Sequence, residues 1–130
     1  MRRLMSNVIA IVMAALIQIE SGGDARAVGD DGRSIGILQM RKIAVREGNR
    51  IVGERRWSYT DRWNPDKSRE MCRVTLEWHY RRGVTDPIKL ACRWRNPNGD
   101  RPPMWYVNKC KREITKAKKG GSEPCASSSK

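Results

Sequence analysis

An apolar run near the start of the chain ends in a single acid and two glycines, and this junction constrains the fold most strongly. The run from Val8 to Ile17 is uncharged, Glu20 follows it, and Gly22 and Gly23 come almost directly afterwards. Because glycine stops a helix that reaches it, the pattern predicts a helix that ends at Glu20 and places its carboxyl beside a loop.

The residues after this junction predict a turn followed by a short hairpin. The segment DARAVGDDGRS is rich in turn-forming residues, and SIGILQM, which ends at Met40, has the alternation of a strand. Within it, Gly36 would allow a backbone or a ligand to approach closely. A helix, an acid, a turn and a hairpin in this order can form one wall of a groove.

Two of these segments resemble motifs of a known enzyme family. Segments 20–23 (ESGG) and 35–40 (IGILQM) are similar to the ES(G) and GLMQ motifs of lysozyme-like lytic transglycosylases and goose-type lysozymes. Further along, segment 64–71 resembles the helix-opening segment of phage-type members, 94–99 resembles their Asn-Gly motif, and 106–109 resembles the start of their closing helix. The resemblance therefore extends over most of the chain.

The resemblance implies a mainly α (α+β) lysozyme-like fold, with about five helices and a small β-hairpin beside the catalytic Glu. A length of 130 residues suffices for one core and is short for two. We therefore expect a single domain over residues 1–118. The composition of residues 119–130 predicts a flexible C-terminal tail.

The resemblance also implies an activity, the cleavage of the β-1,4 bond between N-acetylmuramic acid and N-acetylglucosamine in peptidoglycan. Glu20 would be the catalytic acid, since burial among apolar neighbours raises the pKa of a carboxyl and keeps it protonated near neutral pH. No cofactor and no metal ligand is implied. The residues expected to bind substrate are Ser21, Asp30, Asp31, Gly36, Gln39, Met40, Asn96 and Tyr106.

The number of carboxylates separates two reactions on this fold. A hydrolase needs a second carboxylate, and Asp30 and Asp31 are candidates because goose-type lysozymes also carry an acid in this turn. The further acid that some of them place after the Gln motif is replaced here by Arg41. A lytic transglycosylase uses one acid, and the sugar's own 6-hydroxyl then forms a 1,6-anhydro product. The sequence favours the transglycosylase, with a lysozyme-type hydrolase as the alternative.

Charge and the Asn motif keep two further classes open. The chain has 27 Lys and Arg against 14 acids, a net charge of +13, which predicts attraction to polyanions such as anionic wall polymers. Asn96 lies between Arg95 and Pro97, whereas family members commonly carry an aromatic residue before it and small residues after it. A non-catalytic wall-binding protein is therefore a second alternative. Because the charges are scattered along the chain, a nucleic-acid-binding domain is the least favoured of these functions. The protein is expected to be a monomer.

The N-terminal segment has two interpretations. Met1, Arg2 and Arg3 with the following apolar stretch resemble a signal peptide, but cleavage after Ala15 would separate Glu20 from its helix. The apolar run is also short for a membrane span, which needs about 20 residues. We therefore expect a buried core helix, with a retained anchor as the alternative. The protein is expected to act in the periplasm or cell wall, either exported or delivered as a phage component.

The rest of the chain predicts four more helices, at about 41–53, 66–82, 86–94 and 104–118. Trp57, Tyr59 and Trp63 are expected to plug the edge of the core rather than stack on sugars, and His79 is expected to be packed or solvated. The residues expected to face the core include Ile43, Ala44, Ile51, Val52, Met71, Val74, Thr75, Trp78, Leu90, Ala91, Trp94, Trp105, Tyr106, Val107 and Ile114.

Four cysteines, Cys72, Cys92, Cys110 and Cys125, lack the CxxC spacing of zinc knuckles and thioredoxin-like sites. A single histidine also argues against a zinc site. Disulfides are permitted outside the cytoplasm, but four cysteines allow three full pairings and the sequence selects none of them.

Overall fold

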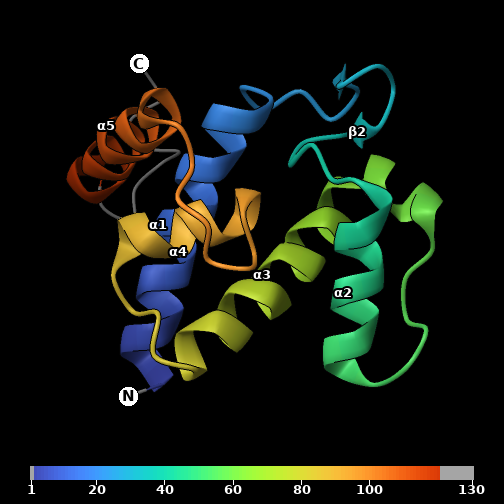
Figure 1. Cartoon of the computed structure of the whole chain (residues 1–130), viewed down its shortest axis with the longest axis horizontal. Coiled ribbons are helices and arrows are strands. Elements are labelled where there is room, and N and C mark those ends of the chain that lie inside the picture. Colours follow the sequence, from blue (N-terminus) through green and yellow to red (C-terminus); the bar gives the residue numbers. More distant parts are fainter. Residues whose placement is uncertain (1, 121–130) are drawn as a thin grey trace.

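The computed structural model describes residues 2–120 and consists mainly of α-helices in this part of the chain (Figure 1). The helices are α1 (Arg2–Glu20), α2 (Lys42–Val52), α3 (Pro65–Arg81), α4 (Pro87–Arg95) and α5 (Met104–Gly120), with a short 3-10 helix, η1 (Tyr59–Trp63). Strands β1 (Val28–Gly29) and β2 (Ser34–Ile35) pair antiparallel, with Val28 opposite Ile35. The expected mainly α fold with a small hairpin after Glu20 is confirmed.

Helix α3 crosses the middle of the molecule and connects two groups of elements (Figure 1). On one side, α1 packs against α3, α4 and α5, and on the other side α2 and η1 pack against α3. Met5, Ile9, Val12 and Leu16 of α1 are all buried in the core, at the spacing of one helix face. The expected core helix ending at Glu20 is therefore present.

By length and composition alone, α1 could also cross a membrane. The helix has 19 residues, whereas the uncharged run considered in the sequence is only a part of it. A core helix of a soluble domain and an N-terminal signal sequence meet the same criteria. In the fold described here, the apolar face of α1 is covered by α3, α4 and α5.

The starts of α3 and α4 follow directly from local sequence. The Asn64 side chain accepts hydrogen bonds from two backbone N–H groups of the first turn of α3, and Asp86 accepts one from the first turn of α4. Pro65 and Pro87 occupy the first helical positions, where the missing N–H costs nothing. All four of the later helices begin and end within two residues of the expected positions.

Some expectations about burial were wrong. Ile43 is 55% exposed and Trp105 is 54% exposed, although both were expected in the core. The buried face of α2 instead carries Val45 and Gly48, because the absence of a side chain at Gly48 lets the Trp57 ring pack directly on the helix. The face of α2 is thus rotated relative to the expected one.

The aromatic residues of the 57–63 segment divide into two kinds. Trp57 is 2% exposed, and its Nε1 donates a hydrogen bond to Glu70, so it plugs the core as expected. Tyr59 and Trp63 are exposed, which contradicts the expectation for these two rings. The Lys42 ammonium and the Arg62 guanidinium lie over the Tyr59 ring, so this aromatic ring contacts cations at the surface.

His79 and the cysteines of the described residues are mostly internal. His79 is 4% exposed, so it is packed rather than solvated. Cys72, Cys92 and Cys110 carry free thiols, and those of Cys92 and Cys110 are in contact between α4 and α5. Burial raises the pKa of the Cys110 thiol to about 12. Cys125 and residues 121–130 of the expected tail lie outside the described residues, while α5 continues to Gly120.

Candidate active site

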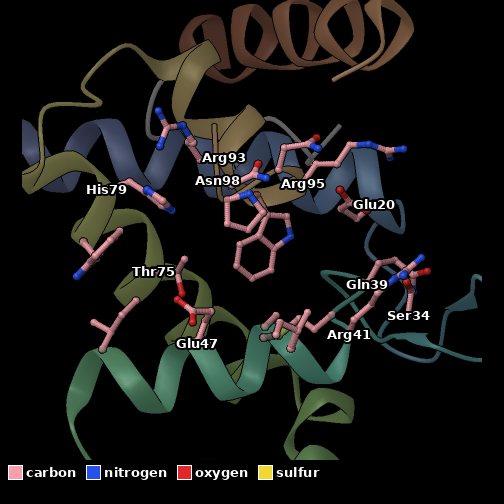
Figure 2. A pocket seen from close by; sticks show the side chains of 18 of the residues that line it. Glu20, Ser34, Gln39, Arg41, Glu47, Thr75, His79, Arg93, Arg95 and Asn98 are labelled. Atoms are coloured by element: carbon pink, nitrogen blue, oxygen red, sulfur yellow. The ribbon is translucent and has the colours of Figure 1, made fainter. Parts of the chain in front are cut away.

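A cleft of about 710 Å³ lies between α2 and α4, and α3 forms its floor (Figure 2). Glu20 and the hairpin residues Ser34 and Gln39 lie at one end of the cleft, and His79 lies toward the other. The wall formed by α2 is largely apolar, with Ile43 and Ile51 among its residues. Charged and polar side chains lie along the rest of the cleft, so it is suited to an extended amphipathic ligand.

Glu20 is the last residue of α1, and its carboxyl is largely removed from water beside α5. Its Oε2 accepts a hydrogen bond of 2.8 Å from the Tyr106 hydroxyl. Burial raises the pKa of Glu20 above its ordinary value, although the hydrogen bond from Tyr106 and the positive charge of Arg95 oppose this rise. The carboxyl is therefore biased toward the protonated form, as a general acid requires.

Tyr106 reaches Glu20 from α5, which is remote in sequence. Its ring is 1% exposed, and both burial and the adjacent Glu20 carboxyl raise the pKa of its hydroxyl. The hydroxyl consequently keeps its proton and can donate a hydrogen bond to Glu20 in either protonation state of the carboxyl. Tyr106 does not line the cleft itself but lies behind the acid.

The turn between β1 and β2 carries a second carboxylate into the same cleft. Asp30 and Asp31 both have positive φ angles, 51° and 57°, and the N–H of Gly32 donates to the carbonyl of Gly29, a geometry typical of tight hairpin turns. Asp30 lines the cleft, whereas the exposed Asp31 lies outside it.

Asp30 is held by two donors. The Ser34 hydroxyl donates to its Oδ2, and the Arg41 guanidinium lies 3.0 Å from the same oxygen. These hydrogen bonds and the charge of Arg41 lower the pKa of Asp30, so Asp30 loses its proton at a lower pH than Glu20 does. The Asp30 charge is itself one of the factors that raise the pKa of Glu20.

Gln39 and Met40 complete the hairpin side of the cleft. The Gln39 side chain donates hydrogen bonds to the carbonyls of Ala27 and Gly36, at 3.0 and 3.1 Å, and borders the cleft as it does so. Gly36 itself does not line the cleft. It packs against the backbone of Arg62, since a Cβ at this position would be 2.1 Å from the Arg62 carbonyl oxygen. The close approach expected at this glycine is thus made by backbone.

Ser21 connects the end of α1 to the hairpin. Its hydroxyl donates a hydrogen bond of 2.7 Å to the carbonyl of Ile37 and accepts one from the N–H of Gly23. Ser21 does not line the cleft. Of the residues expected to bind substrate, the structure brings together in the cleft Asp30, Gln39, Met40 and Asn96, beside Glu20.

Asn96 immediately follows α4 and lines the cleft opposite α2. Its Oδ1 is buried and has no hydrogen-bond partner among the described residues. A buried carbonyl without a partner costs about 1–3 kcal/mol, so this amide is a candidate contact for a ligand donor. The indole N–H of Trp94 donates to the carbonyl of Leu38, which fixes the end of α4 to the hairpin.

The half of the cleft remote from Glu20 was not expected from sequence. Ile43, Glu47 and Ile51 lie four residues apart on one face of α2 and line the cleft. Their spacing was the available signal, but two isoleucines at helical spacing also predict a core face. Opposite them, Arg93 adds a guanidinium cation and the buried His79 adds an imidazole. Burial lowers the pKa of His79, which favours its neutral form.

Comparison with known proteins identifies the family. A family model described as the transglycosylase SLT domain matches residues 1–92. The match includes Glu20, the hairpin and the cleft-lining helices α2 and α3, and it ends before Asn96 and Tyr106. Comparisons with curated proteins and with solved structures found no match. Because the match covers more than half of the chain, the protein belongs to the transglycosylase SLT family of lysozyme-like fold.

Proposed function

We propose that the protein is a lytic transglycosylase that cleaves the β-1,4 bond between N-acetylmuramic acid and N-acetylglucosamine, with Glu20 as its single acid and base. Family membership supports peptidoglycan transglycosylase activity at the family level. The observation that carries the finer proposal is the position of Glu20, at one end of an elongated cleft, with a pKa raised by burial.

The first step is the transfer of the Glu20 proton to the glycosidic oxygen. The bond from this oxygen to the anomeric carbon of the N-acetylmuramic acid breaks, and N-acetylglucosamine leaves as an alcohol. In the second step, the Glu20 carboxylate takes the proton of the 6-hydroxyl, whose oxygen bonds to the anomeric carbon. Glu20 regains its proton, no water is consumed, and the product end is a 1,6-anhydro sugar.

Two neighbours support this change of role at Glu20. The Tyr106 hydroxyl and the positive charge of Arg95 both favour the ionised form of the carboxyl. They therefore stabilise the carboxylate that exists between the two steps, while burial favours the protonated form before and after. The buried Asn96 Oδ1, which none of residues 2–120 hydrogen-bonds, is available to accept a hydrogen bond from a sugar amide or hydroxyl.

A lysozyme-type hydrolase is the second candidate, because Asp30 is an ionised carboxylate in the same cleft. In that reaction a water molecule bonds to the anomeric carbon and gives its proton to the second carboxylate. The released glycan would then end in a reducing sugar.

In this proposal the substrate is the glycan strand of the bacterial wall, and the protein acts in the periplasm or cell wall. It reaches that compartment by export or as a component of a phage particle. Its net charge of +13 supports retention by anionic wall polymers. It acts as a monomer, without a cofactor and without a specific nucleic acid partner.

Mass spectrometry of digested peptidoglycan tests the proposal. We expect the wild-type chain to release glycans with 1,6-anhydro ends, which lack one water relative to reducing ends. Glu20→Gln removes the proton but nearly preserves the shape, so the rate should fall at least about a hundredfold. Glu54→Gln is the matched control, since Glu54 is an exposed acid outside the cleft, and it should retain the wild-type rate.

Three results would contradict parts of this proposal. A Glu20→Gln variant with wild-type activity would show that Glu20 is not the acid. Mainly reducing ends from the wild type would identify the hydrolase. Binding of the wild type to peptidoglycan without any cleavage would identify a wall-binding protein.

A further inference from the structure

An ion pair connects the hairpin to the start of α2 at the Glu20 end of the cleft. The Nη2 of Arg41 lies 3.0 Å from the Oδ2 of Asp30, and both side chains are about half exposed, at 49% and 52%. Arg41 immediately precedes α2, and its side chain lies at the same end of the cleft as Glu20 (Figure 2). The second carboxylate of the cleft is therefore neutralised within the site.

The position of Asp30 is fixed by its turn as well as by this ion pair. The residue has a φ of 51°, a conformation that costs an L-residue about 1 kcal/mol and that a short polar side chain tolerates best. Ser34 donates to the same oxygen that Arg41 contacts, and the Arg33 side chain donates to the Asp30 carbonyl. The carboxylate is thus held by its neighbours rather than free in the cleft.

These contacts affect how readily the Asp30 carboxylate can accept a proton from water. Hydrolysis requires a base that takes a proton from water as the water attacks, and a weaker base does this less well. Protonation of Asp30 would remove the charge that Arg41 contacts and would leave the guanidinium without its partner. The pKa of Asp30, lowered by Ser34 and Arg41, reflects the same preference for the ionised form.

We propose that Arg41 biases the product of this site: by holding the Asp30 carboxylate, it makes Asp30 a poorer base toward water and favours attack by the 6-hydroxyl of the substrate. This inference rests on the proposed function. With Arg41 in place, the O6–H proton passes to Glu20 and the anomeric carbon bonds to O6. Without Arg41, a larger share of turnovers passes a water proton to Asp30, bonds the anomeric carbon to the water oxygen and leaves a reducing end on the glycan.

The test compares product ends released by a set of variants from purified peptidoglycan. Arg41→Met should raise the share of reducing ends about two- to fivefold, the range that corresponds to an exposed ion pair worth up to ~1 kcal/mol. Arg41→Lys keeps a cation near Asp30 and should remain close to the wild-type share. Lys42→Met is the matched control, because it removes one positive charge at the adjacent residue, which does not line the cleft.

A double variant assigns the effect to Asp30. Adding Asp30→Asn to Arg41→Met should return the reducing share to the wild-type level, because the amide cannot take a proton from water. The inference is overturned if Arg41→Met leaves the share unchanged, if Lys42→Met raises it equally, or if the rise persists in the double variant. Circular dichroism of each variant, with Arg41→Lys as the conservative replacement, checks that the fold is retained.

Failure of this inference is distinguishable from failure of the proposed function. The proposed function fails if the wild type does not cleave peptidoglycan, or if Glu20→Gln cleaves it as well as the wild type does. If the wild type forms anhydro ends and Glu20→Gln is inactive, an unchanged product share in Arg41→Met overturns only the role of Arg41.

Discussion

Glu20 and Asp30 are two carboxyl groups of one cleft whose pKa values are shifted in opposite directions. Glu20 is buried beside α5, which raises its pKa, whereas Asp30 is exposed and held by Ser34 and Arg41, which lower its pKa. Such a divergence normally separates an acid from a base in glycosidases. Here the Asp30 carboxylate is paired with the Arg41 guanidinium, and this pairing favours a mechanism in which Glu20 is the single acid and base.

The contact between Tyr106 and Glu20 leads to a prediction on pH dependence. Cleavage requires protonated Glu20, so activity falls as pH rises through its pKa. The Tyr106 hydroxyl lowers that pKa, so Tyr106→Phe should move the alkaline limb of the kcat/KM profile to higher pH. Loss of a hydrogen bond to the carboxylate should also reduce kcat by about tenfold or more.

The control for this measurement is Tyr59→Phe, which removes a hydroxyl from an exposed ring outside the cleft. It should leave both the limb and kcat unchanged. If Tyr106→Phe lowered kcat without moving the limb, its hydroxyl would not act on the Glu20 proton.

Sequence and structure differ in what they reveal at this scale. Glu20 could be predicted because its helix, its glycines and the hairpin are adjacent in sequence. The hydrogen bond from Tyr106 bridges 86 positions, and no local pattern encodes such a contact. The same holds for the pairing of Asp30 with Arg41, because the backbone geometry of the turn decides which way Asp30 points.

At the scale of elements, the hairpin is joined to η1 and α3 by buried polar contacts. Arg62 is 9% exposed, and its side chain donates to the carbonyls of Met40 and Tyr59, at 3.2 and 2.8 Å. Its own carbonyl accepts from the Ser68 hydroxyl and lies against Gly36. The position of the hairpin relative to the cleft therefore depends on Gly36.

Gly36→Ala should consequently destabilise the fold. The residue has a φ of 82°, and the added methyl would meet backbone, so the free energy of unfolding should fall by at least about 2 kcal/mol. Gly32→Ala is the matched control, since Gly32 has a φ of 88° and a Cβ added there would meet no atom of the described residues within 4 Å beyond its chain neighbours; it should cost about 1–2 kcal/mol. Urea denaturation measures both, and equal losses would show that the contact with Arg62 is not limiting.

Helix positions could be predicted from sequence, while the buried faces could be predicted only in part. Caps and prolines are local signals, and they set the starts of α3 and α4 correctly. The face of α2 depends on the Trp57 ring that packs on Gly48, a partner that periodicity does not identify. Ile43 and Ile51 were therefore expected in the core, although they line the cleft.

At the scale of the whole molecule, the net charge of +13 and the cleft have separate roles in the proposed function. In that proposal the cleft binds the glycan by packing and hydrogen bonds at contact distance, which salt screens much less than it screens interactions between separated surface charges. The charge acts over distances comparable to the Debye length, about 10 Å at 0.1 M salt and about 3 Å at 1 M. Binding to a bacterial wall should therefore contain a salt-sensitive and a salt-resistant component.

Sedimentation of the inactive Glu20→Gln variant with purified walls separates these components. Walls that retain their anionic polymers should bind more protein at low salt than walls stripped of them, and the difference should disappear near 1 M salt. The residual binding should be competed by soluble glycan fragments, which occupy the cleft. Duplex DNA is the control polyanion: binding to it should be weaker than to intact walls at equal salt. Tighter binding to duplex DNA than to intact walls, with a steep dependence on salt, would instead indicate a nucleic-acid-binding protein. Recognition of a glycan in the cleft gives no reason for the protein to prefer DNA over walls.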